Sequence, residues 1–569
     1  MMQGTRRGVM LGGAAALAAG SRAFAAEEIA VYAGGPILTM DDAQPRAQAV
    51  AVRGGRILAV GGRDEVLARA GRGARLVDLG GRALLPGFVD PHGHVSFVGL
   101  QAVSANLLPA PDGEGNSIPD LQRIVRAWRE ANQPSVERYG LIIGFGYDDS
   151  QLREQRHPTR KDLDEISSDA PVLFIHQSGH LGVANSKALE AAGVNAGTPD
   201  PQGGVFRREP DGKTPNGVME EHAFMAVMGR LLAKLDLDAN LKMIAEGVKL
   251  YTSYGYTTCQ DGKSSSGGVK ALQLAASKGM LSADVVAYPD VLTATDVVFP
   301  PLLSRTYTNR LRIGGVKLSI DGSPQGKTAW LSQPYFVPPD GQSAAYAGYP
   351  AVPVDQCLAA IDKAFANGWQ ILVHANGDAA IDVLIAGVRE ATRKHGPGDR
   401  RPVLIHGQTA REDQVDACKA LGIIPSFFPM HTFYWGDWHR DSVLGPVRAE
   451  NISPTGWALR RGMMFTTHHD APVAKPDAMR VLSATVSRRT RSGDILGAHQ
   501  RVPVEAALKA MTIWPAYQHF EEATKGSLVP GKLADFAVLS ADPTATDPEK
   551  LASLKVTETI KEGVSIWRG

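Results

Sequence analysis

The segment from Leu85 to His94 ends an apolar run with two histidines that are one residue apart. In an extended segment successive side chains point to opposite faces, so His92 and His94 point the same way and Gly93 leaves room on the other side. Neutral imidazoles are good ligands of zinc and of neighbouring divalent metals. A lone His-x-His pair is usually two surface histidines, but the apolar run before this one, and later His and Asp residues, favour a metal site.

Further candidate ligands stand at the ends of other predicted strands. His374 and His406 each close a run of apolar residues, and Asp470 follows another such run. A single residue of this kind is more often a buried histidine or a helix-capping aspartate. As a set they favour one shared site, because the parallel strands of a barrel deliver their C-terminal ends to a common mouth.

The middle of the chain alternates the patterns of helix and strand. Residues Asn240–Tyr254 are apolar at helical spacing, and Gly255 is placed to end that helix. A strand pattern follows, and later segments repeat this order. We therefore predict an α/β fold with a (β/α)8 TIM-type barrel over residues 86–519. The segment of about 101–240 is too long for one barrel loop, which predicts an inserted subdomain that covers the barrel mouth.

Both ends of the mature chain carry short strand patterns separated by turn residues. Neither the N-terminal residues 28–85 nor the C-terminal residues contain enough strands for a stable sheet of their own. We therefore predict that residues 26–85 and 520–569 combine into one small β-sandwich domain.

The first residues have the pattern of an export signal. Arg6 and Arg7 precede a short run of Ala, Gly and Leu, and the small-residue pattern Ala23-Phe24-Ala25 follows. This pattern predicts a twin-arginine signal peptide over residues 1–25 and a periplasmic protein. The apolar run is too short to span a bilayer, so we expect no stable membrane anchor.

The composition is that of an ordinary globular protein. The 569 residues include 60 basic and 59 acidic side chains, which gives a formal net charge of +1. So balanced a charge argues against a nucleic-acid partner and against a polybasic membrane surface. A small-molecule substrate is the expected partner, and assembly into a homo-oligomer stays open.

Several of these motifs together resemble the amidohydrolase superfamily, in the family-3 branch that includes N-substituted formamide deformylase and relatives of D-aminoacylase. They are the His92–His94 strand and the segments 316–323, 374–379, 406–408 and 470–473. The closing segment 526–535 also resembles the superfamily's return to its terminal β domain. The resemblance covers nearly the whole mature chain.

The resemblance implies a centre of one or two divalent ions, with zinc favoured. It assigns His92, His94 and Asp470 to one ion and His374 and His406 to a second. It also implies that Lys317 bridges both ions as an N6-carboxylated lysine, because a neutral amine that captures CO2 becomes an anionic oxygen ligand. Lys317 could instead pair with a carboxylate such as Asp321, which leaves a single-metal site open.

Three more residues receive weaker assignments. His180 lies in a motif of the same branch and is a candidate substrate contact, with a structural role equally open. Trp435 lies in an aromatic cluster that could form an apolar wall of the pocket, although such clusters are more often core. Asp378 is predicted to orient a histidine ligand.

The sequence departs from the branch in two places. Ile405 stands where many relatives have Glu before the histidine of the sixth strand, so an outer contact is either missing or replaced. His468 and His469 stand where Gly-Ser is common before the aspartate. They could orient Asp470, contact substrate or simply pack.

The expected activity is metal-dependent hydrolysis of a carbon–nitrogen bond in a small amide, N-acyl or N-formyl compound. A bound divalent ion lowers the pKa of water from ~15.7 to about 7. Asp470 can then act as the catalytic base and return the proton to the leaving amine. Ester or lactone hydrolysis at the same site is an alternative, and a non-catalytic periplasmic metal- or ligand-binding protein is another.

Overall fold

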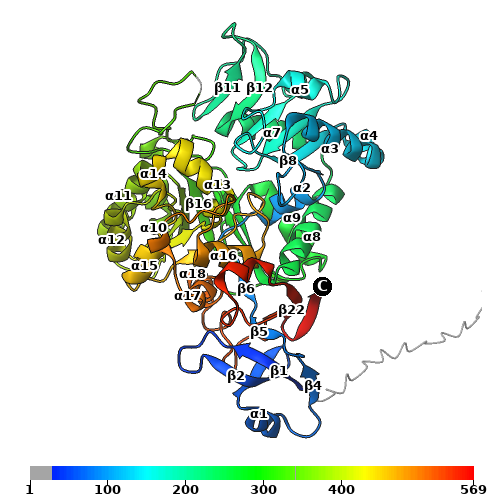
Figure 1. Cartoon of the computed structure of the whole chain (residues 1–569), viewed down its shortest axis with the longest axis vertical. Helices are drawn as coiled ribbons and strands as arrows, with labels where there is room; N and C mark the ends of the chain where they lie inside the picture. Colours follow the sequence, from blue (N-terminus) through cyan, green and yellow to red (C-terminus); the bar gives the residue numbers. More distant parts are fainter. Residues whose placement is uncertain (1–27, 340) are drawn as a thin grey trace, which may run out of the picture.

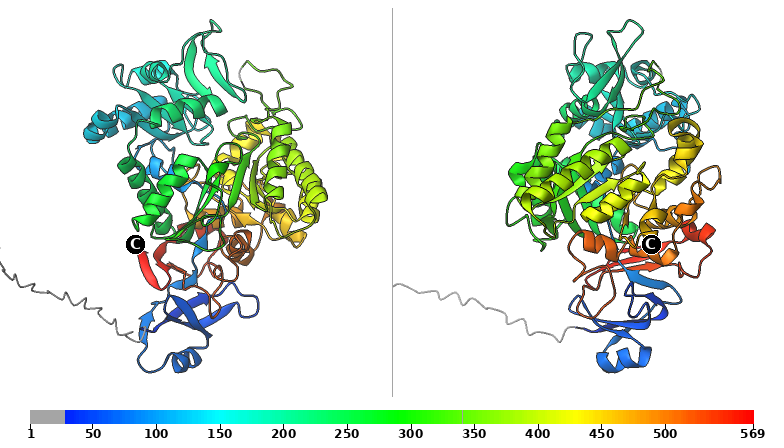
Figure 2. Two further views of the ribbon diagram at one scale, coloured as in Figure 1. Left: turned by 180° about the vertical axis from the view of Figure 1, so that it is seen from behind. Right: turned by 90° about the vertical axis from the view of Figure 1, so that its left-hand side faces the viewer.

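The computed structural model describes residues 28–339 and 341–569, which form three regions along one long axis (Figure 1). The strands of both chain ends lie at one end of the molecule, parallel sheets lie in the middle, and the segment with β7–β12 lies at the far end (Figure 2). The predicted signal peptide, residues 1–25, lies outside the described residues. Among the helices described, none combines the length and the apolar character needed to cross a membrane.

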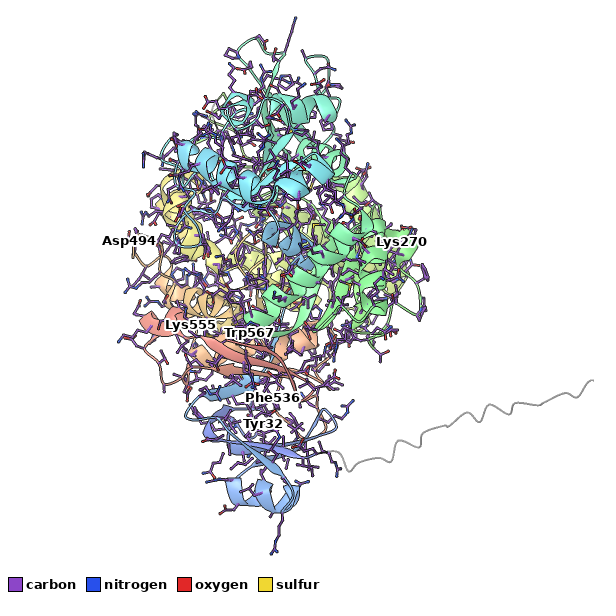
Figure 3. All side chains as sticks on the ribbon, turned by 90° about the vertical axis from the view of Figure 1, so that its right-hand side faces the viewer. Tyr32, Lys270, Asp494, Phe536, Lys555 and Trp567 are labelled. Atoms are coloured by element: carbon purple, nitrogen blue, oxygen red, sulfur yellow. The ribbon has the colours of Figure 1, made fainter. Side chains whose placement is uncertain are left out.

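Both ends of the chain enter a single eight-stranded sheet. Its order is β23-β22-β21-β5-β1-β2-β3, and β4 pairs with β1. Tyr32 and Phe536, which come from opposite ends of the sequence, lie together there with ring centroids 5.4 Å apart (Figure 3). The strands are β1 (Ala30–Leu38), β2 (Arg46–Arg53), β3 (Arg56–Gly61), β4 (Arg75–Asp78), β5 (Ala83–Pro86), β21 (Phe536–Leu539), β22 (Val556–Lys561) and β23 (Val564–Arg568).

The pairing of β5 with β21 joins strands from the two ends of the chain in one sheet. Leu84 pairs with Val538 and Leu85 with Ala537, in antiparallel register. The predicted sandwich of two facing sheets stays a prediction, because hydrogen bonds connect all eight of these strands into one sheet.

Two sheets of parallel strands form the middle of the molecule. The first has the order β15-β14-β13-β6 and the second has the order β16-β17-β18-β19-β20. The strands are β6 (Phe88–Val89), β13 (Tyr256–Ser264), β14 (Asp284–Pro289), β15 (Leu311–Ile313), β16 (Gly315–Ser319), β17 (Gln370–Ala375), β18 (Val403–His406), β19 (Ile424–Phe427) and β20 (Thr466–Thr467). The helices between them include α8 (Leu237–Ser253), α9 (Ser266–Ser277), α10 (Val354–Ala366), α11 (Asp378–His395) and α12 (Glu412–Leu421).

Short contacts join the edges of these two parallel sheets. A parallel bridge connects Asp290 with Lys317 on one side. On the other side Thr467 N–H donates to Ala510 O, and Val89 N–H donates to Met511 O. Residues 510–511 therefore stand between β20 and β6 where a direct ladder would close a barrel, so the closed (β/α)8 barrel stays a prediction.

The segment inserted after β6 has a sheet of its own. Its order is β11-β12-β10-β9-β8-β7, with helices packed on it. Helix α3 (Ile118–Ala131) begins after Ser117, whose hydroxyl accepts from Asp120 N–H. The other elements are α2 (Val95–Ala102), β7 (Ala105–Asn106), α4 (Gln133–Tyr139), β8 (Ile142–Tyr147), α5 (Arg160–Asp164), β9 (Val172–His176), β10 (Leu181–Ala184), α6 (Ser186–Ala191), β11 (Gly204–Arg208), β12 (Pro215–Glu220) and α7 (Glu221–Leu232).

Candidate metal centre

His92 and His94 follow β6 and turn the same ring nitrogen toward one point. The Nδ1 atom of His92 lies 2.8 Å from Gln260 Oε1, and that of His94 lies 2.7 Å from the carbonyl oxygen of Gly262. Since Gln260 Nε2 donates to Pro91 O, the amide orientation of Gln260 is fixed with its oxygen toward His92. Both Nδ1 atoms must therefore carry hydrogens, which leaves both Nε2 lone pairs available.

Asp470 follows β20 and faces these two Nε2 atoms. Its Oδ1 atom lies 3.3 Å from Nε2 of His92 and 3.3 Å from Nε2 of His94. That oxygen is buried and accepts no hydrogen bond from the described residues. Three lone-pair donors that converge on one point, one of them anionic, fit a divalent cation and do not satisfy one another. These residues could therefore hold a metal ion.

His374 and His406 form a second pair at the ends of β17 and β18. His374 Nδ1 lies 3.0 Å from His406 Nε2, while His374 Nε2 lies 3.1 Å from the carbonyl oxygen of Gly322. His406 Nε2 is also 3.9 Å from Asp470 Oδ2. The ligand atoms of His92, His406 and Asp470 all lie within 4.8 Å of one another. The second pair therefore adjoins the first.

The buried histidines are held in the neutral form. Burial lowers the pKa of His92, His374 and His406 well below the usual value, and neighbouring positive charges act in the same direction. Neutral imidazole is the form that binds metals.

Lys317 lies on β16 among these ligands. Its Nζ atom is 3.3 Å from His92 Nε2, and burial lowers the pKa of Lys317 to about 7. The alternative partner Asp321 is engaged elsewhere, because it accepts the backbone N–H groups of Trp330, Asn376 and Gly377. The structure thus places Lys317 with the histidines and not in an ion pair with Asp321.

His180 reaches the centre from the inserted segment. Its ring centroid is 5.1 Å from that of His374, and its side chain is 18% exposed. His180 Nδ1 lies 2.7 Å from Glu221 Oε2, and Glu221 Oε1 accepts from the hydroxyl of Thr328. The interaction with His180 lowers the pKa of the Glu221 carboxyl despite its burial. Sequence reasoning missed Glu221, whose only signal is a pair of acidic residues before a helix.

Backbone strain marks the same residues. His406, Asp470 and Glu221 have φ values of 73°, 51° and 47°, in the left-handed region that non-glycine residues rarely adopt. Each such residue costs on the order of 1–3 kcal/mol and is retained where the surrounding structure requires it, often at functional sites.

Two of the weaker assignments are placed differently. Asp378 begins α11, and its carboxylate accepts from Ser332 and Arg411 instead of orienting a histidine. Trp435 is buried, and its Nε1–H donates to Asp148 of the inserted segment. Its ring therefore serves as core between α13 (Met430–Trp438) and the insertion, and forms no exposed wall.

A second group of potential ligands consists of Asp148, Asp149 and His176. His176 Nε2 lies 3.0 Å from Asp149 Oδ1 and 3.7 Å from Asp148 Oδ1. These two carboxylates raise the pKa of His176 to about 9 although the ring is buried. A protonated histidine between two aspartates is already satisfied, so this cluster is an ion pair at the base of the turn that carries His180.

Comparison with known proteins gives consistent results over nearly the whole chain. The model of a family described as "Amidohydrolase family" matches residues 75–566. N-substituted formamide deformylase of Arthrobacter pascens is 27% identical over 545 residues, which are 93% of this chain and 96% of that protein. The putative amidohydrolase YtcJ of Bacillus subtilis is 26% identical over 550 residues, 95% of this chain and 99% of that protein.

Solved structures share the fold. The crystal structure of an uncharacterized metal-dependent hydrolase from Pyrococcus horikoshii superposes with a TM-score of 0.72 at 24% identity, and the match covers 92% of this chain and 99% of that one. Another with the same description, from Pyrococcus furiosus, gives a TM-score of 0.69 at 25% identity, with 91% and 100% coverage.

Proposed function

The chain belongs to the amidohydrolase family, and we propose that it is a metal-dependent hydrolase that cleaves a carbon–nitrogen bond of a small molecule. The observation that carries the proposal is the convergence of the His92 and His94 Nε2 atoms on the unpaired Oδ1 of Asp470, each at 3.3 Å. The names of relatives that align over nearly their full length, among them a formamide deformylase, favour an amide, N-acyl or N-formyl substrate.

The residues of the centre have different roles in the proposed reaction. A divalent ion held by the histidines supplies a lowered water pKa and polarises a carbonyl group when it is bound. Asp470 lies between the two histidine pairs, where its carboxylate can take a proton from the attacking water and deliver it to the leaving amine. His180 lies at the exposed side of the centre, where it can contact the substrate.

We infer that Lys317 completes the centre as a carbamate, with zinc as the favoured metal and one or two ions bound. The reaction joins the neutral amine to CO2, forms a carbon–nitrogen bond and releases one proton. The low pKa of Lys317 makes the neutral amine available near pH 7. Its Nζ atom, 3.3 Å from His92 Nε2, is close enough for a carbamate oxygen to reach the same ligand cluster.

Two broader expectations join this proposal. We propose that the two parallel sheets act as one barrel, since contacts bridge both of their edges. We also propose export to the periplasm by the twin-arginine route, on the basis of Arg6, Arg7 and the short apolar run.

Replacement of Asp470 by Asn tests the proposal. Purified protein is analysed for zinc and other divalent metals, and turnover is measured on matched N-formyl amides, N-acyl amides, esters and lactones. We expect bound metal, turnover of at least one amide, and a drop in kcat of about a hundredfold to ten-thousandfold in Asp470→Asn, the range of general acid–base catalysis. Asp382 lies on α11 and forms an exposed ion pair with Arg411, so Asp382→Asn is the control.

Three results would lead to other conclusions. Turnover of esters or lactones alone would assign the site to that alternative chemistry. Bound metal without turnover of any substrate would favour a binding protein. Turnover that resists both chelation and the Asp470 change would contradict a metal hydrolase.

A further inference from the structure

We infer that His468 and Ser426 are positioning residues that hold the His406 ring with its Nε2 atom free for a metal ion. The inference rests on the proposed function, since it concerns how one of the proposed ligands is oriented. It also assigns a role to His468, for which the sequence left orientation of Asp470, substrate contact and packing open.

A short chain of hydrogen bonds carries this inference. His406 Nδ1 lies 3.1 Å from His468 Nε2, and His468 Nδ1 lies 3.0 Å from the hydroxyl oxygen of Ser426. All three residues are buried, so water does not compete for these contacts. The chain runs from β18 through the residue after β20 and back to β19.

The hydrogen positions follow from what His406 must do as a ligand. If Nε2 of His406 offers its lone pair to an ion, the ring hydrogen must sit on Nδ1, where it donates to His468 Nε2. His468 then carries its own hydrogen on Nδ1 and donates it to Ser426 Oγ. A complete tautomer assignment therefore exists in which every donor has an acceptor.

The His468 ring is itself fixed in place. It stacks on Phe428 with ring centroids 5.3 Å apart and an interplanar angle of 26°. Its backbone N–H donates to Phe427 O at the end of β19. Ile405, the residue before His406, packs in an apolar cluster with Val403 and Leu372. The polar support of His406 thus comes from the neighbouring strands.

The same arrangement recurs at the other histidines of the centre. Each of the other three histidines also has a hydrogen-bond partner at the ring nitrogen that is not offered to an ion. These partners are Gln260 Oε1 for His92, Gly262 O for His94 and Gly322 O for His374. Residues in such positions fix the orientation of metal ligands, and their loss costs about 10–100-fold in metal affinity. His468, like Gln260 and unlike the two glycine carbonyls, is a side chain that mutation can remove without disturbing the backbone.

Zinc titration of metal-free protein against a chromophoric chelator tests the inference. We expect His468→Phe to weaken zinc binding at the His374–His406 position by about 10–100-fold. His468→Gln, whose amide oxygen can accept from His406 Nδ1, should restore most of this affinity. Ser426→Ala should give a smaller loss, and the visible spectrum of the cobalt form should change in His468→Phe.

His439→Phe is the matched control, because His439 is another buried histidine that contacts a histidine, with its Nε2 atom 3.1 Å from His431 Nδ1. Its zinc affinity should equal that of the wild type, and thermal unfolding of all metal-free variants shows whether they are folded. Wild-type affinity in folded His468→Phe, or an equal loss in His439→Phe, would overturn the inference alone. A wild-type chain that binds no zinc would overturn the proposed function as well.

Discussion

At the scale of single residues, the candidate centre is defined by the hydrogen-bond partners of its proposed ligands as much as by the ligands. Each of its four histidines has a neutral hydrogen-bond partner, namely an amide oxygen, two backbone carbonyls and another imidazole. Asp321 Oδ1 also lies 3.5 Å from His374 Nε2. Asp470 is then the one carboxylate among the proposed ligands. A second negative charge would have to come from Lys317, and this makes its chemical state the main variable of the site.

We predict that Lys317 captures CO2 in a pH-dependent way. The folded pKa is about 7, below the usual value of a lysine, so the neutral amine predominates above pH 7 and the charged form below it. In zinc-free protein under a constant pressure of ¹³CO2, the carbamate signal in ¹³C NMR should be strong at pH 8 and should fade as the pH drops to 6.

Lys317→Met supplies the background for that measurement, because it removes the amine and keeps a side chain of similar length. A signal of equal strength in this variant would show that the carbamate forms on another amine.

The grouping of the proposed ligands could be predicted from the sequence, but their hydrogen-bond partners could not. The His92–His94 spacing is local, and its common direction follows from the alternation of an extended strand. Gln260, Ser426 and Glu221 gain their roles only when distant strands come together, and each is an ordinary polar residue in its own segment. The same limit explains Asp378, whose position after His374 resembles a motif while its carboxylate accepts from the distant residues Ser332 and Arg411.

At the scale of elements, the turn between β9 and β10 connects the insertion to the centre. His176 at its base is fixed by Asp149, and His180 at its end reaches His374. Between them Gln177 Nε2 donates to the carbonyl oxygen of Val473, in the loop that follows Asp470. The insertion therefore contacts the loop of the proposed base and also supplies a side chain at the mouth.

Glu221→Gln should impair the use of substrate without removing the metal. The change keeps the size of the side chain but weakens its hydrogen bond to His180, and a hydrogen bond to a charged group contributes roughly 1.5–3 kcal/mol. We expect kcat/KM to fall about tenfold or more, and zinc content to stay at the wild-type level.

The neighbouring residue offers a matched control for this prediction. Glu220 contacts Arg207 and Tyr349 instead of His180. A comparable fall of kcat/KM in Glu220→Gln would attribute the effect to local charge and not to the orientation of His180.

Most helices and strands around the centre follow the sequence pattern, and one departs from it for a physical reason. The helix predicted over 240–254 is α8, with bounds within a few residues. The apolar run 369–374 forms the strand β17. The apolar run 463–467 forms a strand only over Thr466–Thr467. Met463 N–H instead donates to Ala458 O and extends the end of the preceding helix α15 (Thr455–Arg460).

At the scale of the whole molecule, buried ion pairs tie the terminal sheet to the parallel strands. Lys561 Nζ lies 2.7 Å from Asp284 Oδ2 and 2.8 Å from Asp535 Oδ2. Lys525 Nζ lies 2.7 Å from the same oxygen of Asp284 and 2.6 Å from Glu521 Oε2. β22 and β14 are thereby connected through charges that have little access to water.

Lys561→Met should destabilise the protein by about 3 kcal/mol, since it leaves buried carboxylates without one of their partners. Chemical unfolding at pH 7 measures the loss. Arg568→Met breaks a pair with Glu558 on the same edge, in which the arginine side chain is 73% and the glutamate side chain 10% exposed. This change should cost about 1 kcal/mol, because water reaches the arginine. Equal losses in the two variants would contradict the importance of the buried network.

The network also predicts how acid affects stability. Despite burial, Lys525 and Lys561 lower the pKa of Asp284 to about 2, whereas an unfolded aspartate titrates near about 3.9. Its contribution is therefore complete above pH 4 and is lost as the pH falls from about 4 toward 2. Asp284→Asn should flatten the acid limb of a plot of unfolding free energy against pH in that window.

The pairing of β5 with β21 has a consequence for biosynthesis. β5 lies directly before β6 and the His92–His94 pair, yet its partner β21 ends only at Leu539. All six proposed ligands leave the ribosome before β21, the strand that pairs with β5 just ahead of His92 and His94. A chain that terminates early, just after Asp470, would carry every ligand residue and still lack this support, so a lasting metal centre should be a property of the finished polypeptide.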